Sequence, residues 1–217
     1  IDHRQFYNIT KFKNALTWIE QTGSAATLIG LLYRNINQIP TTLTANLIYL
    51  AIMSNTIRCK SHNTTKYDLS ILNWLSTIIN INDEFVNQMF KEKSIINNIY
   101  KVIDEDTITK LEIIHNKKTA ISQLEIINVE EFLQKNKLII LDSLDVVKQN
   151  RQADSIFINL IDTITGKTYF IFSDQIIEEI VKSVIHNIVK KKNNYYYQCD
   201  DIFLRKEIIA LIMNKNN

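Results

Sequence analysis

Apolar residues recur at intervals of three and four through the first half of the chain, which is the period of an amphipathic helix. Residues that favour helix N-termini precede these stretches, and Gly23 and Pro40 lie where two of them stop. The pattern predicts a succession of helices joined by short connections, as in a helical bundle. These helices begin at or near Thr10, Ser24, Thr41 or Thr42, Asp68, and Asn82 or Asp83, and the last is expected to reach Ile103.

The pattern changes in the second half. Short helices are predicted at 108–115 and 129–137, the second capped by Asn128, and the apolar run 138–141 is typical of a buried strand. Residues 155–163 and 168–172 are rich in β-branched and aromatic side chains and flank a turn at Gly166, which predicts a β-hairpin. Two more helices are expected, one capped by Asp174 and one that begins at Asp200 or Asp201.

We therefore predict a helix-dominated α+β fold, in which an N-terminal helical bundle-like half packs with a C-terminal half that contains a small antiparallel hairpin or sheet. The subdomains are predicted as 1–103 and 104–217, which could also form one continuous domain. The order helix, short helix, helix, strand and hairpin also fits a winged-helix-like element, with 129–137 as its third helix and Gly166 at the tip of the wing. No side-chain motif supports that alternative, so a generic α+β arrangement is favoured.

Glycine and proline are scarce, with three glycines and one proline in 217 residues. Phosphate-binding loops, dinucleotide turns and nucleophile elbows need closely spaced glycines, because only glycine takes positive φ freely and lets a ligand approach the backbone. Gly23, Gly30 and Gly166 are too far apart for any of these motifs. The sequence therefore excludes several enzyme classes without naming a function.

Composition says more about the genome and the compartment than about activity. The chain has 39 Ile, 24 Asn and 20 Lys but five Arg, a bias typical of an A/T-rich genome such as that of a large DNA virus, a yeast, a protist or an A/T-rich bacterium. Its net charge is +2. Two distant cysteines, Cys59 and Cys199, predict free thiols in a reducing, intracellular compartment. The polar first ten residues and the short apolar runs predict neither a signal peptide nor a transmembrane segment, and because the sequence begins at Ile1 we expect a domain of a larger protein.

Residues that could carry chemistry are scattered. The four histidines form no metal-binding spacing with each other or with cysteine, so no metal site and no cofactor are predicted. Most paired carboxylates fall in first turns of predicted helices, where they complement the helix dipole, and the cluster 104–106 is interpreted as a solvated turn. A nuclease-like set of Asp142, Asp145 and Asp162 is only weakly indicated. We therefore assign no catalytic residue and predict that the protein is not an enzyme.

One segment suggests ligand binding, because lysines neutralise phosphates and aromatic rings stack on bases. The candidate nucleic-acid-binding residues are Lys167, Lys182, Lys190, Lys191, Lys192, Tyr195, Tyr196 and Tyr197. Lysines at a helix C-terminus and a short strand of tyrosines explain the same segment without a ligand. The function predicted first is a non-catalytic interaction or scaffold module with a protein partner or self-association. A winged-helix-like nucleic-acid-binding module is the alternative.

Overall fold

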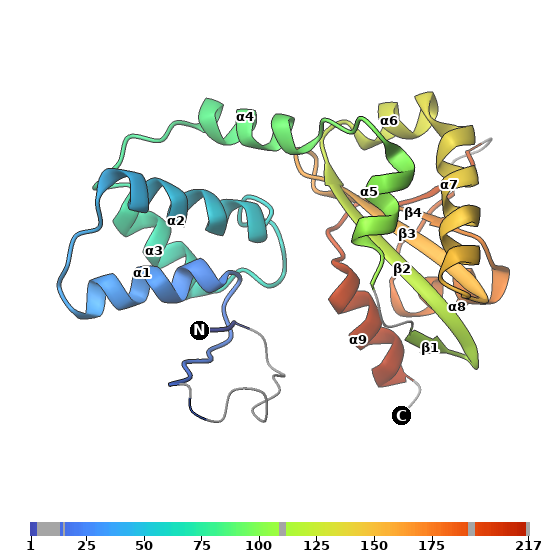
Figure 1. Ribbon diagram of the computed structural model, residues 1–217, viewed down its shortest axis with the longest axis horizontal. Helices are drawn as coiled ribbons and strands as arrows, with labels where there is room; N and C mark the ends of the chain where they lie inside the picture. Colours follow the sequence, from blue (N-terminus) through green and yellow to red (C-terminus); the bar gives the residue numbers. More distant parts are fainter. Residues whose placement is uncertain (4–13, 15, 109–111, 191–193, 216–217) are drawn as a thin grey trace. The chain divides into compact units, whose positions relative to one another are not determined.

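The computed structural model describes residues 1–3, 14, 16–108, 112–190 and 194–215 (Figure 1). The chain divides into two compact units, Ile1–Met89 and Phe90–Asn217, called unit 1 and unit 2 below. The subdomain boundary predicted from the sequence, after residue 103, falls inside a helix of unit 2.

Unit 1 is built on three helices, α1 (Ala25–Asn35), α2 (Thr42–Asn55) and α3 (Lys66–Leu75). Ser24 and Thr41 cap the first two as predicted. Helix α3 is capped by Thr65, three residues before the predicted cap Asp68, which instead completes a capping box as the third helical residue. The fully buried core of these helices contains Leu28, Ala45, Ile52, Ile71 and Leu75.

Two expected helices differ from the prediction. Residues 16–23 form no helix, and Ile19 pairs with Asp2 in a β-bridge, while 4–13 and 15 lie outside the described residues. The long helix expected from Asn82 or Asp83 to Ile103 is two helices, α4 (Asp83–Lys93) and α5 (Ile99–Asp106). Asn98 caps α5 through a hydrogen bond from the backbone N–H of Lys101, a cap that the apolar pattern alone conceals.

Unit 2 contains a five-stranded sheet with the order β1-β2-β3-β4-β5. Strands β2 and β3 are parallel, and the other neighbours are antiparallel. The parallel pair needs a long connection, which α6 and α7 supply. The elements are β1 (Glu112–Ile114), β2 (Lys117–Ile126), α6 (Val129–Lys135), α7 (Lys137–Asn150), β3 (Ser155–Asp162), β4 (Lys167–Phe172), α8 (Gln175–Val184), β5 (Tyr197–Cys199) and α9 (Arg205–Lys215).

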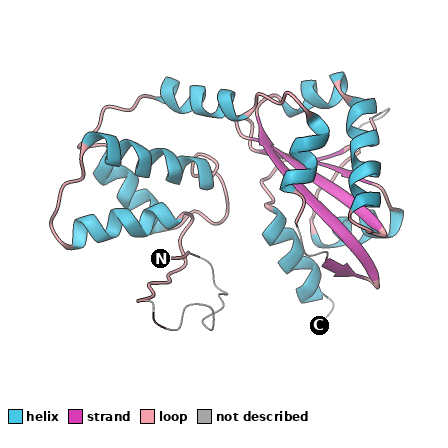
Figure 2. Cartoon of the chain, viewed as in Figure 1, coloured by secondary structure: helices cyan, strands magenta, loops and turns pink. Residues whose placement is uncertain are grey.

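Helices cover both faces of this sheet (Figure 2). On one face Ala120, Leu124 and Ile158 pack with residues of α5, α6 and α7. On the other face Ile121 and Phe157 pack with residues of α8 and α9. Strand β3 lies between these two layers, and all of its residues are buried, which makes it the centre of the unit.

The structure confirms the helix-dominated α+β fold and the hairpin β3–β4 around Gly166. The winged-helix alternative is wrong, because this hairpin is the middle of a five-stranded sheet and not a wing at its edge. Residues 138–141 belong to α7 and not to a strand, and residues 112–114 form a strand where a helix was predicted. Within the described part of the chain, every helix is too short or too polar to cross a lipid bilayer.

Candidate functional site

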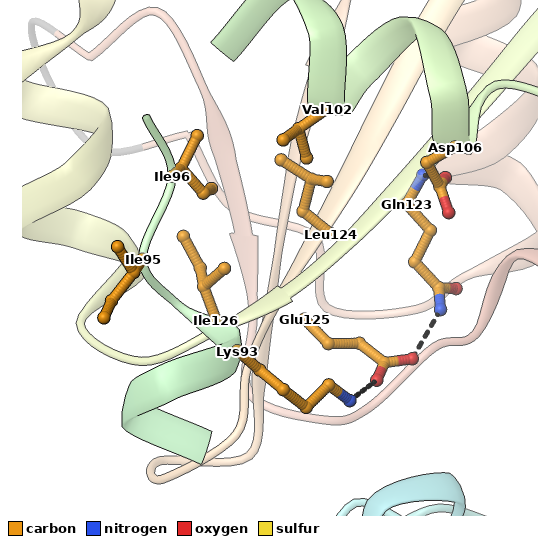
Figure 3. A pocket seen from close by; sticks show the side chains of 9 residues that line it. All are labelled: Lys93, Ile95, Ile96, Val102, Asp106, Gln123, Leu124, Glu125 and Ile126. Atoms are coloured by element: carbon orange, nitrogen blue, oxygen red, sulfur yellow. Dashed lines mark hydrogen bonds and ion pairs between the residues drawn. The ribbon is translucent and has the colours of Figure 1, made fainter. Parts of the chain in front are cut away.

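A cavity of about 300 Å³ lies in unit 2 beside the carboxyl-terminal half of β2 (Figure 3). Helix α5 and the segment before it form the rest of its wall. This volume is at the lower end of the range for ligand pockets, so the cavity suits a small ligand. Its apolar lining is Ile95, Ile96, Val102, Leu124 and Ile126, and its polar lining is Lys93, Asp106, Gln123 and Glu125.

The polar lining begins with two residues of β2 that point to the same side of the strand, because side chains alternate along a strand. Gln123 Nε2 donates a hydrogen bond to Glu125 Oε1 over 2.9 Å. The other oxygen of Glu125 lies 3.3 Å from Nζ of Lys93, the last residue of α4. A lysine, a carboxylate and an amide are thus linked in a row along the cavity (Figure 3).

Arg205, the first residue of α9, joins this row from the side of Asp106. Its Nη1 lies 2.8 Å from Oδ2 of Asp106 and 2.7 Å from the carbonyl oxygen of the same residue. Oδ2 of Asp106 also accepts the backbone N–H of Gln123 over 2.5 Å. The guanidinium is therefore held between the C-terminus of α5 and the outer side of β2.

The segment that leads into α9 is bound to the sheet at alternate residues. Thr168 donates its hydroxyl to the carbonyl oxygen of Asp201 over 2.7 Å and accepts the N–H of Phe203 over 3.0 Å. The N–H of Arg205 donates to Gln123 Oε1 over 2.6 Å. These bonds fix where α9 begins, and so fix the position of Arg205 next to the cavity.

The charged residues that line the cavity are Lys93, Asp106 and Glu125, and Arg205 balances their charge from outside the lining by its ion pair with Asp106. Among the described residues, every hydrogen bond of the Arg205 guanidinium uses Nη1. Its Nε and Nη2 are donors in the plane that suits an oxyanion. Nε and Nη2 are thus the donors that Arg205 can offer to an anion beside the cavity, while Asp106 holds Nη1.

The described lysines that were predicted to bind nucleic acid form ion pairs and ring contacts, and Lys182 and Lys190 both lie over the ring of Tyr197. Lys167 lies 3.1 Å from Asp200, and Lys182 lies 3.3 Å from Glu178. Lys190 lies over the ring of Tyr197, with Nζ 4.9 Å from the ring centroid. Lys191 and Lys192 lie outside the described residues.

The three tyrosines of that set mainly pack inside unit 2. Tyr196 and Tyr197 are 1% and 8% exposed, so these two rings are not available to stack on a base. The hydroxyl of Tyr195 donates to the carbonyl oxygen of Leu133 over 2.7 Å. Burial raises the pKa of all three phenols, that of Tyr197 to about 12 with a further contribution from Glu178. As a ligand site this lysine–tyrosine set stays a prediction.

Most carboxylates considered as metal ligands have other roles, and Asp142 is exposed on α7. Asp104 pairs with Arg151, and Asp145 pairs with Lys148 at the surface. Asp162 is buried and accepts backbone N–H groups in the turn that follows β3. Across the described residues, no three His, Cys, Asp or Glu side chains gather as a metal site.

Unit 1 has its own buried polar centre at Asp68, which is fully shielded from solvent. Oδ2 of Asp68 accepts the N–H of Gly23 over 2.9 Å and the N–H and hydroxyl of Thr65, each over 2.7 Å, and Oδ1 accepts the hydroxyl of Thr27. Gly23 is required by this close approach, because a Cβ there would come within 2.9 Å of Asp68 Oδ2 and 2.7 Å of Thr56 Cγ2. All of these partners are internal, so the centre organises the unit.

Sequence reasoning missed the residues at the unit 2 cavity. Arg205 falls inside a predicted helix, and Gln123 falls in a strand that was not predicted. One signal was present, since Asn159 interrupts the apolar run of β3 and a polar residue at such a position needs a hydrogen-bonding partner.

Comparison with solved structures identifies a shared fold. The chain matches, over 94% of its own length and 69% of the other chain, the crystal structure of a Methanococcus jannaschii protein described as a candidate family II inorganic pyrophosphatase. The TM-score is 0.73 and the sequence identity is 23%. No family model matches the sequence, and no curated protein matches it.

This match corrects the function predicted from the sequence. The protein with the same fold is described as an enzyme, which contradicts a non-catalytic interaction or scaffold module and the prediction that the chain is not an enzyme. It also contradicts the nucleic-acid-binding alternative. Exposed apolar side chains are present in unit 1, such as Leu43 and Leu47 of α2, and a protein partner or self-association through them stays a prediction.

Proposed function

We propose that this protein acts on a phosphoanhydride, with inorganic pyrophosphate as the first candidate substrate, and that unit 2 binds the substrate at the cavity beside Arg205. The observation that carries the proposal is the fold shared over 94% of the chain with a protein described as a candidate inorganic pyrophosphatase. The size of the cavity agrees with it, since about 300 Å³ suits a small ligand.

The charges at the cavity agree with a phosphate-containing ligand. Hydrolysis of a phosphoanhydride depends mainly on positioning and on cations that offset the charge of the phosphate oxygens. Arg205 presents Nε and Nη2, which can bind two oxygens of one phosphate in parallel. Lys93 supplies a second cation on a flexible stem at the other end of the row.

The carboxylates have a supporting role in this proposal. Asp106 holds Arg205 by two contacts with Nη1, so that the guanidinium is oriented before a ligand arrives. Glu125 holds Lys93 over 3.3 Å, and an arriving polyanion would compete for that ammonium group. Orientation before binding lowers the entropy cost of binding.

An intracellular location is part of the proposal. Cys59 and Cys199 are both free thiols. Unpaired cysteines are typical of the reducing compartments where phosphoanhydrides are metabolised.

The experiment is release of orthophosphate by the purified protein from pyrophosphate, from a short linear polyphosphate and, as a control, from p-nitrophenyl phosphate, a monoester. Mg²⁺ is included because it is the usual counter-ion of such substrates. Release from the anhydrides with little from the monoester is expected. Absence of both phosphate release and calorimetric binding of pyrophosphate would contradict the proposal.

A further inference from the structure

Asn159 is the polar exception in the centre of the sheet. It lies on β3, all of whose residues are buried, and is itself fully shielded from solvent. Its neighbours on the strand, Ile158 and Leu160, are fully buried apolar residues. An amide at this position costs free energy on folding unless its polar atoms are satisfied.

The donor end of the Asn159 amide is satisfied by two acceptors. Nδ2 donates to Gln123 Oε1 over 3.2 Å and to the carbonyl oxygen of Phe203 over 3.0 Å. Because a carbonyl oxygen can only accept, Nδ2 must point toward these atoms. The acceptor end, Oδ1, is buried and has no hydrogen-bond partner among the described residues.

The orientation of the Gln123 amide follows from the same reasoning about donors and acceptors. Its Oε1 accepts from Asn159 and from the backbone N–H of Arg205, which can only donate. Nε2 is therefore directed at Glu125, which holds Lys93. A continuous chain of hydrogen bonds runs from the buried Asn159 through Gln123 and Glu125 to the ammonium group of Lys93, and Gln123 also binds the backbone N–H of Arg205.

We infer that Asn159 is a positioning residue, which orients the Gln123 amide and the start of α9 so that Arg205 is held against Asp106 beside the phosphate-binding cavity. The inference rests on the proposed function. A buried amide with an unpartnered oxygen lowers stability, so packing alone does not account for it. The two hydrogen bonds that Asn159 Nδ2 donates explain the presence of the amide. One is accepted by Phe203 in the segment before α9, and the other by Gln123, which in turn accepts the N–H of Arg205.

The test compares Asn159→Val with Asn159→Thr, two β-branched residues of nearly equal shape that suit a central strand. Of the two, only threonine keeps a side-chain hydrogen-bond donor, its hydroxyl group. We expect the KM for pyrophosphate to rise about 10-fold in Asn159→Val, while kcat stays within about 2-fold of the wild-type value. This is the result expected when a substitution weakens substrate binding and leaves the chemical step unchanged. Asn159→Thr should lie between Asn159→Val and the wild type. The control is Ile158→Leu on the opposite face of β3, which should leave KM unchanged.

Two kinetic outcomes overturn the inference. One is a folded Asn159→Val variant with the wild-type KM, and the other is equal impairment of both variants, which would make lost volume the cause. A second readout does not depend on activity. The ¹⁵N order parameter of the Arg205 backbone N–H, which donates to Gln123, should fall below about 0.85, the level of rigid backbone, in Asn159→Val. If the wild-type protein neither cleaves nor binds pyrophosphate, the proposed function fails, and an unchanged order parameter then overturns the positioning role as well.

Discussion

Arg205 and Asp106 form a two-point contact, in which Nη1 of the arginine lies 2.8 Å from the carboxylate and 2.7 Å from the carbonyl oxygen of the same aspartate. Asp106 is the last residue of α5, so the guanidinium also binds the negative end of that helix. One residue thereby joins the start of α9 to the end of α5 at the proposed substrate cavity.

Arg205→Ala should lower kcat/KM for pyrophosphate about 10- to 100-fold, because charge-assisted hydrogen bonds contribute roughly 1.5–3 kcal/mol each. Arg205→Lys should recover part of the loss, since lysine keeps the charge without the planar pair of donors. Initial rates of phosphate release against substrate concentration measure both.

Arg151 provides a matched control for this substitution. It binds the side chain and the carbonyl oxygen of Asp104 much as Arg205 binds Asp106, but Asp104, unlike Asp106, is not among the residues that line the cavity. Arg151→Ala should destabilise unit 2 to a similar extent while leaving the KM for pyrophosphate unchanged. An equal loss of activity in both variants would assign the effect of Arg205 to stability instead of substrate binding.

Lys93→Met should raise the KM for pyrophosphate several-fold and change stability by less than about 1 kcal/mol, because the Lys93–Glu125 pair is partly exposed. Lys101→Met removes a comparable cation from a surface pair with Glu105 and should have no effect on KM. Steady-state kinetics at two ionic strengths measures the difference. A KM equal to the wild-type value in Lys93→Met would remove this residue from the site.

The sequence predicted the elements that depend on local signals. Ser24, Thr41 and Asp174 cap helices as expected, and the hairpin around Gly166 forms, because capping and turn chemistry act over a few residues. The prediction of a strand at 138–141 is wrong. A short apolar run is too short to show a helical or a strand period, and here the residues on either side of it form the same helix, α7.

The candidate site could not be read from the sequence, because pairing across the chain creates it. Strand β2 carries polar residues at 122, 123 and 125, which hid its strand character. Gln123, Asn159 and Arg205 are remote from one another along the chain, and the register of β2 with β3 brings the first two together. Asn159 conflicts in chemistry with its apolar neighbours in sequence, Ile158 and Leu160.

Asp68→Asn should destabilise unit 1 by about 1–3 kcal/mol, because an amide group would place a donor against the N–H groups that now donate to the carboxylate. Trp18 and Trp74 both belong to unit 1, so the urea dependence of tryptophan fluorescence reports on this unit. Asp83→Asn, at an exposed position in the first turn of α4, is the control and should change stability by less than about 0.5 kcal/mol. Equal midpoints for the two variants would refute the central role of Asp68.

The Lys117–Asp174 pair should make unit 2 sensitive to acid. The hydrogen bond from Lys117 is the main cause of the lowered pKa of Asp174, and the N–H of Ile177 at the start of α8 adds to it, while burial opposes both. A carboxyl whose pKa is lower in the folded state stabilises above its unfolded pKa of about 3.9, and this contribution is lost as the pH falls through the folded pKa. Lys117→Met should therefore cost a few tenths to about 1 kcal/mol at pH 7 and almost nothing near pH 2. Urea unfolding followed by tyrosine circular dichroism at both pH values measures this.

Asp174→Asn, which keeps a capping oxygen, should show the same loss of pH dependence. A Lys117→Met variant with the wild-type difference between the two pH values would show that the pair contributes nothing to folding.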